Sequence, residues 1–273
     1  MTCINAVSFR EYPSIETICR LVRETGFDAL ELSRPHFYEK LTTEGTRRRF
    51  AEWAAESGMS LYGFDCWVEV EPYTAFEETL ADFYRSIKWA CDLDLGMIIS
   101  HDPWMHVNGD RSPSDCLSVN FDLFWRVAEQ CVERGLQLVF EPHPDTYSMQ
   151  NSWAIDFIDR LSEGLPAKSV GLLYDCCHYG VGQRDTYVQS IAELGSRIQH
   201  IHFSDGDRQT YALHLALGDG DLDLEGIISA FQSTNYKGTL TCDVYNNPLL
   251  EDCARRSVQR IRDVESALGI ASL

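Results

Sequence analysis

Acidic residues and histidines follow short apolar runs along the whole chain, and both residue types can bind a divalent cation or move protons. They are Glu31, Asp65, His101, Asp102, Glu141, His143, Asp175, His178, His200, His202, Asp205 and Asp243. If the apolar runs are neighbouring parallel strands, their carboxyl ends bring these side chains to one rim. Carboxylates gathered there repel one another unless a cation or a proton network offsets their charge, and a divalent metal is the simplest solution.

Each of these residues also has an ordinary structural explanation. A single acidic residue after a strand is more often a helix N-cap or a solvated loop group than a metal ligand. His200 and His202 alternate on one predicted strand and point to the same side, where either can be a hydrogen-bonded core histidine. The convergence of many such residues, rather than any single one, favours a metal site.

The donor types favour a hard cation. Glu141, Asp175, His202 and Asp243 together offer three oxygen donors and one nitrogen donor. This set suits Mn²⁺ or Mg²⁺, while Co²⁺ or Zn²⁺ stays open. An oxygen-rich site with open positions can hold a hydroxyl and the neighbouring carbonyl of one substrate, which acidifies the C–H bond between them.

Eight short β-rich runs alternate with longer amphipathic runs, which predicts a parallel sheet joined by crossover helices. The predicted strands are 4–9, 29–32, 61–66, 97–100, 136–140, 170–174, 198–203 and 239–244. Their centres are about 34 residues apart, the size of one strand, one helix and two loops. Because no GxGxxG sequence begins a helix, a closed barrel is favoured over an open doubly wound sheet. We therefore predict an α/β fold, a single (β/α)8 TIM barrel domain over residues 1–273.

The segments between the predicted strands have helical periodicity. In the segment 76–91, apolar residues recur at steps of three and four and predict one stripe against the sheet, at Phe76, Leu80, Phe83, Ile87 and Cys91. Ser14 predicts the start of the first helix and Gly26 its end, and Gly269 predicts the end of the last helix.

In this order and spacing, five motifs resemble those of the xylose isomerase-like barrel superfamily, a group of sugar isomerases, epimerases and dehydratases with a DNA-repair endonuclease branch. The motifs are Phe140-Glu141-Pro142-His143, Asp175-x-x-His178, His200-x-His202, Leu217-Gly218-Asp219-Gly220-Asp221, and the acidic end of the last strand at Asp243. The resemblance covers essentially the whole chain. It implies a barrel enzyme with one divalent metal ion and a small sugar-like substrate.

The resemblance implies a role for each motif residue. Glu141, Asp175, His202 and Asp243 are expected to bind the metal, and Glu141 and Asp243 to act as the catalytic acid/base pair. His178 and Arg208 match positions that hold substrate oxygens in the epimerases. The family usually has glutamate where this chain has Asp243, and the loss of one methylene shortens the reach by about 1.5 Å. This difference favours a one-base isomerase, a dehydratase or another lyase over a two-base epimerase.

Other residues beyond the strand ends are expected to bind substrate. Trp67 and Trp104 are predicted to wall the pocket, with His101 beside them. The alternatives are that the tryptophans only roof the barrel, that His101 orients a metal ligand, and that Arg208 only pairs with carboxylates of its own loop.

Three functional hypotheses follow. The leading one is a metal-dependent isomerase or epimerase of a small keto-sugar or polyol-derived substrate, in which Glu141 removes the proton next to the carbonyl and the metal stabilises the enediolate. The second is a dehydratase or other lyase that uses the same site but expels a β-hydroxyl as water. The third is a non-catalytic barrel that binds a metabolite or serves as an accessory subunit.

The charge balance narrows the partners. Lys and Arg total 23 against 42 Asp and Glu, so the formal charge of −19 disfavours nucleic acid and anionic membrane surfaces. Two ligands of the DNA-repair branch are also missing, because Asp65 stands where that branch has histidine and Ala212 where it has aspartate. A small-molecule partner is expected, and a homo-oligomer stays open.

The beginning of the chain has no basic segment followed by an apolar stretch, and nowhere do about 18 apolar residues run together. A cytoplasmic protein without a membrane span is therefore expected. The ten cysteines are scattered without a CxxC pair, so they are expected to be reduced, several of them as small buried hydrophobes.

Overall fold

The computed structural model describes residues 2–9 and 11–270, which form a closed barrel of eight parallel strands. The strands are β1 (Cys3–Asn5), β2 (Ala29–Ser33), β3 (Ser60–Asp65), β4 (Met97–Ser100), β5 (Gln137–Phe140), β6 (Val170–Asp175), β7 (Ile198–Phe203) and β8 (Thr239–Cys242). Each strand pairs with the next, and β1 closes the barrel on β8, where Cys3 lies opposite Thr241. The predicted (β/α)8 fold is confirmed. Residues 1, 10 and 271–273 of the predicted domain lie outside the described residues.

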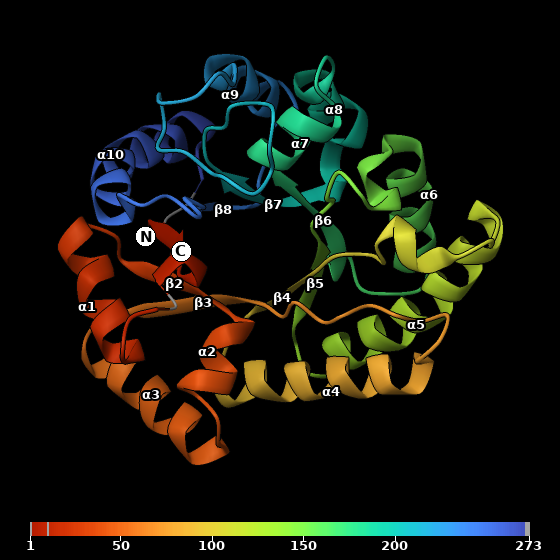
Figure 1. Ribbon diagram of the computed structural model, residues 1–273, viewed down its shortest axis with the longest axis horizontal. Coiled ribbons are helices and arrows are strands. Elements are labelled where there is room, and N and C mark those ends of the chain that lie inside the picture. Colours follow the sequence, from red (N-terminus) through yellow and green to blue (C-terminus); the bar gives the residue numbers. More distant parts are fainter. Residues whose placement is uncertain (1, 10, 271–273) are drawn as a thin grey trace.

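Helices form the outer layer around the strands (Figure 1). The α-helices are α1 (Ile15–Thr25), α2 (Arg34–Glu39), α3 (Glu44–Glu56), α4 (Phe76–Asp92), α5 (Pro113–Glu133), α6 (Asn151–Ser162), α7 (Cys176–Gly182), α8 (Tyr187–Leu194), α9 (Leu224–Ser233) and α10 (Leu250–Leu268). Four short 3-10 turns, also within the described residues, are η1 (Val7–Phe9), η2 (Met105–Asn108), η3 (Tyr147–Met149) and η4 (Gly195–Arg197).

The predicted helix ends are confirmed at both ends of α1. The Ser14 side chain accepts a hydrogen bond from the Thr17 N–H at 3.1 Å, and Gly26 ends the helix with a φ of 103°. The predicted stripe of α4 is also buried at Leu80, Phe83 and Ile87. Cys91 is exposed, however, because the buried stripe continues from Ile87 to Ala90 and leaves Cys91 outside it.

The first and last predicted strands are longer than the observed ones. The prediction was 4–9, but β1 ends at Asn5, whose Oδ1 accepts a hydrogen bond from the Val7 N–H at 2.9 Å. The chain then turns through η1, where the Phe9 N–H donates to the Ala6 carbonyl at 2.9 Å. In the same way β8 ends at Cys242, so Asp243 stands just beyond the strand.

The core has two parts. A large apolar cluster packs the outer faces of the strands against the helices. A small one, made of Met97, Ile99, Val139 and Leu173, comes from the alternate positions of β4, β5 and β6 that face the barrel interior. This small cluster is an apolar floor beneath the polar residues that follow on the same strands.

Within residues 2–9 and 11–270, no helix is both long and apolar enough to cross a membrane. The ten cysteines carry free thiols, as the sequence predicts, and all except Cys91 are buried.

Buried His36 in α2 predicts sensitivity to acid. Its Nδ1 accepts a hydrogen bond from the Ser33 N–H at 3.2 Å, and burial, assisted by the charge of Lys40, lowers its pKa from 6.5 to about 3. Between these values the unfolded chain binds a proton that the folded chain does not, so acid destabilises the fold. We expect the free energy of unfolding to fall by about 1.4 kcal/mol per pH unit more steeply in the wild type than in His36→Gln between pH 6 and 4.

Urea titrations at several pH values measure this difference. His106→Gln, which removes an exposed histidine, is the matched control and should keep the wild-type slope. Parallel pH profiles for the wild type and His36→Gln would contradict the prediction.

Candidate metal and acid/base site

The four residues predicted to bind metal meet at His202 of β7. From His202 Nδ1, the distance is 2.9 Å to Glu141 Oε1, 3.7 Å to Asp243 Oδ2 and 3.8 Å to Asp175 Oδ2. All four side chains are buried. Residues far apart in the sequence therefore converge at the mouth formed by the carboxyl ends of the strands, as expected.

Strand geometry places these residues above the apolar floor. Side chains two residues apart on a strand point to the same side. Glu141 therefore follows Val139 of the floor on β5, and Asp175 follows Leu173 on β6. In both strands the sequence changes from apolar to acidic at the carboxyl end, which builds the site.

Two carboxylate oxygens have no hydrogen-bond donor in the described part of the chain. They are Asp175 Oδ2 and Asp243 Oδ1, both buried, and an unpaired buried acceptor is costly. Donor atoms 2.1 Å from one ion are about 3.0 Å apart at a right angle and about 3.4 Å apart in a tetrahedron. Glu141, Asp175 and His202 offer ligand atoms within 4.8 Å of one another, so these three residues fit a divalent cation, and Asp243 Oδ2 lies beside them, 3.7 Å from His202 Nδ1.

The pKa shifts of Glu141 and His202 also indicate that positive charge does not balance the carboxylates of the site. Burial raises the pKa of Glu141 to about 7, against the opposing effect of His202 and with the support of Asp175 and Asp243. Burial would lower the pKa of His202, but the charges of Glu31, Glu141 and Asp243 raise it well above its usual value. The pKa values of both Glu141 and His202 are therefore raised, so both groups hold a proton more tightly than they do in water.

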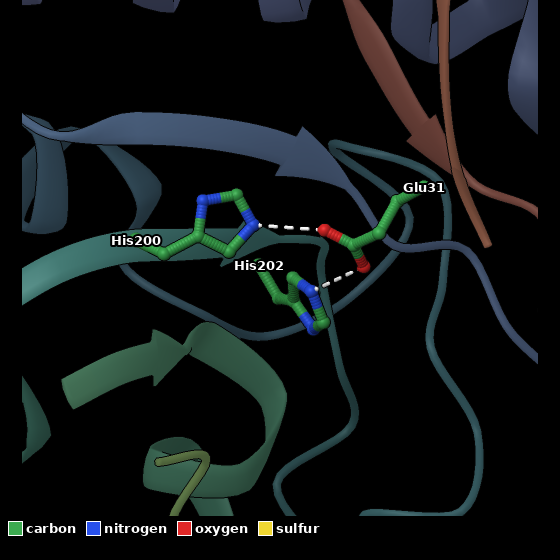
Figure 2. A group of neighbouring side chains, drawn as sticks. All are labelled: Glu31, His200 and His202. Carbon is green, nitrogen blue, oxygen red and sulfur yellow. Dashed lines mark hydrogen bonds and ion pairs between the residues drawn. The ribbon is translucent and has the colours of Figure 1, made fainter. Parts of the chain in front are cut away.

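Glu31 of β2 holds two histidines and is the main residue to which the sequence assigned no role. Figure 2 shows both rings of β7 directed at its carboxylate. Glu31 Oε1 lies 2.9 Å from His202 Nε2, and Glu31 Oε2 lies 3.0 Å from His200 Nε2. With Nε2 directed at Glu31, His202 Nδ1 faces the other carboxylates and lies 2.9 Å from Glu141 Oε1. Nδ1 is the atom that would bind a cation once its proton has left.

His200 is the core histidine of the pair. Its Nδ1 lies 2.7 Å from Thr239 Oγ1, which in turn accepts a hydrogen bond from the Tyr62 hydroxyl at 2.7 Å. Burial lowers the pKa of His200 although the Glu31 charge opposes this. The ring is thus a neutral link between the barrel floor and Glu31.

His214 engages the last-strand carboxylate, which sequence reasoning also missed. His214 Nδ1 lies 2.8 Å from Asp243 Oδ2. The backbone holds this pair together, because the His214 N–H donates to the Tyr245 carbonyl at 3.1 Å. One oxygen of the shortened Asp243 is therefore occupied by an imidazole, and Oδ1 remains for a cation.

Asp205 explains the Gly-Asp-Gly motif of the sequence. Its carboxylate accepts hydrogen bonds from the backbone N–H groups of Gly206, Gly218, Gly220 and Leu222 at 2.8 to 3.2 Å. A Cβ atom at Gly220 would lie only 2.4 Å from Asp205 Oδ1, so glycine is required there. This carboxylate fixes both ends of the loop 206–222, which carries His214 over the site.

Replacement of Asp205 by alanine is expected to loosen this loop. Four backbone donors lose their acceptor, and at about 1 kcal/mol or more each the loop should open locally. Hydrogen exchange should accelerate within residues 206–222 and remain unchanged in α4. Asp207→Ala is the control, since the Asp207 carboxylate accepts hydrogen bonds from the N–H groups of Gln209 and Thr210, its close neighbours in the chain. Equal hydrogen-exchange rates within residues 206–222 in Asp205→Ala and in the wild type would contradict the prediction.

A cavity of about 280 Å³ opens over the site. Its lining includes the predicted residues Trp67, Trp104, Glu141, His178, His202 and Asp243, together with His143, Tyr211 and His214, which the prediction did not include. His178 Nδ1 lies 3.2 Å from the Pro142 carbonyl and 3.8 Å from Glu141 Oε1. Trp67, Trp104 and His178 therefore line this cavity.

The structure does not place two of the predicted substrate-binding residues on this cavity. His101 lies behind Trp104, with ring centroids 4.6 Å apart, and its Nδ1 is 2.7 Å from the Asp102 carbonyl. The Arg208 guanidinium donates to the Arg184 carbonyl at 2.5 Å and lies over the Tyr187 ring. His101 packs against the Trp104 ring, and the Arg208 guanidinium contacts residues that do not line the cavity.

A closed parallel barrel with carboxylates and histidines at the carboxyl ends of its strands defines a class of proteins whose chemistry takes place at that mouth. The family model for xylose isomerase-like TIM barrels matches residues 19–264. The chain belongs to this family, as the sequence motifs predict.

Known relatives include an inosose dehydratase from Lactiplantibacillus plantarum, which is 28% identical over 136 residues, or 44% of this chain and 44% of the relative. The match therefore spans less than half the length of that relative. Among solved structures, a D-tagatose 3-epimerase-like protein has a TM-score of 0.79 at 16% identity, over 98% of both chains. The IOLI protein with a bound zinc atom has a TM-score of 0.76 at 14% identity, also over 98% of both chains. These structures share the fold.

Proposed function

We propose that this protein is a divalent-metal-dependent enzyme that removes the proton next to the carbonyl of a small keto-polyol and expels a neighbouring hydroxyl as water. The observation that carries this proposal is the convergence of three carboxylates on His202 Nδ1, at 2.9, 3.7 and 3.8 Å, inside a cavity that admits a small molecule.

Glu141, Asp175, His202 and Asp243 would hold the cation. When bound, it supplies positive charge for a substrate oxygen that becomes negative as the proton leaves. Mn²⁺ and Mg²⁺ fit a donor set of three oxygens and one nitrogen. Zn²⁺ and Co²⁺ are equally to be tested, because a structural relative carries zinc.

Glu141 is the proposed base. Its carboxylate lines the cavity, and burial places its pKa at about 7, where a carboxylate is basic enough to accept a carbon-bound proton. The C–H electrons pass to the carbonyl oxygen to give an enolate of the substrate. They then return to form the C=C bond as the C–O bond to the β-hydroxyl breaks, and the hydroxyl leaves as water with the proton that Glu141 took up, which restores the Glu141 carboxylate. His178 lines the same cavity and is positioned to hydrogen-bond a substrate oxygen.

Dehydration is favoured over epimerisation by the state of Asp243. Its Oδ2 lies 2.8 Å from His214 Nδ1. The carboxylate that would act as a second base on the opposite side of the substrate is therefore already paired with an imidazole. The activity of the curated relative, inosose dehydratase, supports the same outcome.

An isomerase or epimerase is the second candidate. Asp243 Oδ1 is buried and accepts no hydrogen bond from the described residues, so one oxygen of this carboxylate has no donor and could take up a proton. Glu141 alone would also suffice for an isomerase, because one base can return the proton to the neighbouring carbon.

Incubation with keto-polyols and each metal in deuterated water separates the candidates. Dehydration gives a product lighter by one water, whereas isomerisation or epimerisation leaves the formula unchanged and incorporates deuterium. If the purified protein holds less than about one divalent ion per ten chains and added Mn²⁺ produces no deuterium exchange, the enzymatic proposal is wrong and a metabolite-binding or accessory role follows.

A further inference from the structure

A second hollow lies beside the cavity of the candidate site. It has a volume of about 530 Å³, and Val7, Trp67 and Tyr245 line both this outer space and the inner one of about 280 Å³. The two spaces therefore adjoin at these side chains. Small-molecule cavities usually measure ~300 to 1,000 Å³, so the inner cavity suits one small keto-sugar and leaves the outer space unused.

Three of the eight residues that line the outer space are aromatic: Tyr38, Trp67 and Tyr245. Tyr38 of α2 is 51% exposed, and Trp67, which follows β3, is 45% exposed. Trp67 also has a φ of 38°, in the left-handed region that bulky residues rarely adopt. Such a conformation persists where the surrounding structure enforces it, and here it holds the indole at the junction of the two spaces. Flat, exposed aromatic faces suit the C–H face of a sugar ring.

The charged groups around the outer space argue against an anionic ligand. The Arg34 guanidinium already donates to the Asp82 carboxylate, the Tyr38 hydroxyl and the Cys66 carbonyl, so its charge is balanced. Glu69 adds an exposed carboxylate to the lining, and the formal charge of −19 repels a phosphate further. Carboxylates accept hydrogen bonds from neutral hydroxyl groups, which a sugar ring offers.

We infer that the outer space is a subsite for a second, uncharged sugar ring attached to the keto-sugar held in the inner cavity. This inference rests on the proposed function for the inner ring. The substrate class is therefore a glycosylated keto-sugar, with its reacting carbons at Glu141 and its second ring against Tyr38 and Trp67.

Calorimetric titration of the Mn²⁺-supplemented protein tests the subsite. The probes are D-fructose and three glucosyl-fructose disaccharides, linked through O3, O4 and O6. At least one disaccharide is expected to bind about tenfold more tightly than fructose, since one stacked ring contributes about that factor. Tyr38→Ala should reduce this ratio to about two or less. Tyr38→Phe keeps the ring and should preserve it, as should Tyr84→Ala, which removes an exposed tyrosine outside both spaces.

The outcomes separate the subsite from the proposed function. Deuterium exchange with equal binding of fructose and all disaccharides would overturn the subsite alone. Preferred binding of a disaccharide without exchange would support the subsite and count against the proposed reaction. Tighter binding of fructose 6-phosphate than of every disaccharide, an unchanged ratio in Tyr38→Ala, or no binding of any probe would each overturn the subsite.

Discussion

Replacement of Glu141 by glutamine is expected to lower turnover by about 10³-fold, because the amide cannot accept the proton that the carboxylate removes. Glutamine has the same length and still presents an oxygen where Glu141 Oε1 lies 2.9 Å from His202 Nδ1. A cation should therefore remain bound. Initial rates and metal content, measured on the same preparation, check both parts. Turnover within about tenfold of the wild type would refute the role of Glu141 as the base.

The pH dependence of metal binding in this variant is a second readout. Burial raises the pKa of Glu141 to about 7, so below that pH a proton competes with the cation for the carboxylate. Protonation of Glu141 alone should therefore lower the apparent Mn²⁺ affinity about tenfold for each pH unit as the pH drops from 7 to 5. The fall should be shallower in Glu141→Gln. Glu129→Gln, at an exposed position on α5, should keep the wild-type dependence.

The barrel was predictable because its signals are local. β4 and β7 match the predicted strands residue for residue, since an apolar run and its flanking turns lie within a few positions of each other. The length of β1 was overestimated, because the Asn5 side chain accepts a hydrogen bond from the Val7 N–H and the chain turns there. This interaction is also local, but the composition of the segment does not reveal it.

The residues of the site could be predicted from the sequence only where they belong to a recognisable motif. The four candidate ligands follow from strand-end spacing and the family resemblance, but Glu31 does not. Its partners His200 and His202 lie 169 and 171 residues away, on a strand that is not a neighbour of β2, and meet it only across the barrel interior. Arg208 was assigned to the substrate by position alone. Its left-handed backbone, with a φ of 57°, accompanies a side chain directed to the Arg184 carbonyl instead.

Replacement of Glu31 by glutamine is expected to weaken Mn²⁺ binding by about 10- to 100-fold, the usual effect of losing a carboxylate that orients a ligand histidine. Glu31 accepts from His202 Nε2 through Oε1 and from His200 Nε2 through Oε2. Glutamine offers one oxygen and one amide NH₂ in place of the two carboxylate oxygens. One of the two imidazole rings must therefore direct its N–H at the amide NH₂, which cannot accept a hydrogen bond. If that ring is His202, it must rotate or change tautomer, and its Nδ1 is no longer fixed toward the cation.

The same change should lower the free energy of unfolding by about 3 kcal/mol, since it breaks a fully buried network. Thr241→Val is the matched control, because it removes only the weaker donor to Oε2, at 3.2 Å, and leaves the charge of Glu31 in place. It should cost about 1 kcal/mol and keep Mn²⁺ affinity within about threefold of the wild type.

The tautomer of His202 distinguishes an orienting role from simple structural support. Nitrogen-15 NMR of the imidazole rings, with a diamagnetic ion such as Zn²⁺ bound, should show Nε2 of His202 protonated and Nδ1 without a proton in the wild type. Glu31→Gln should disturb this signature even where urea unfolding shows that the variant is still folded. A variant that loses stability but keeps both the tautomer and the wild-type Mn²⁺ affinity would show that Glu31 only supports the barrel.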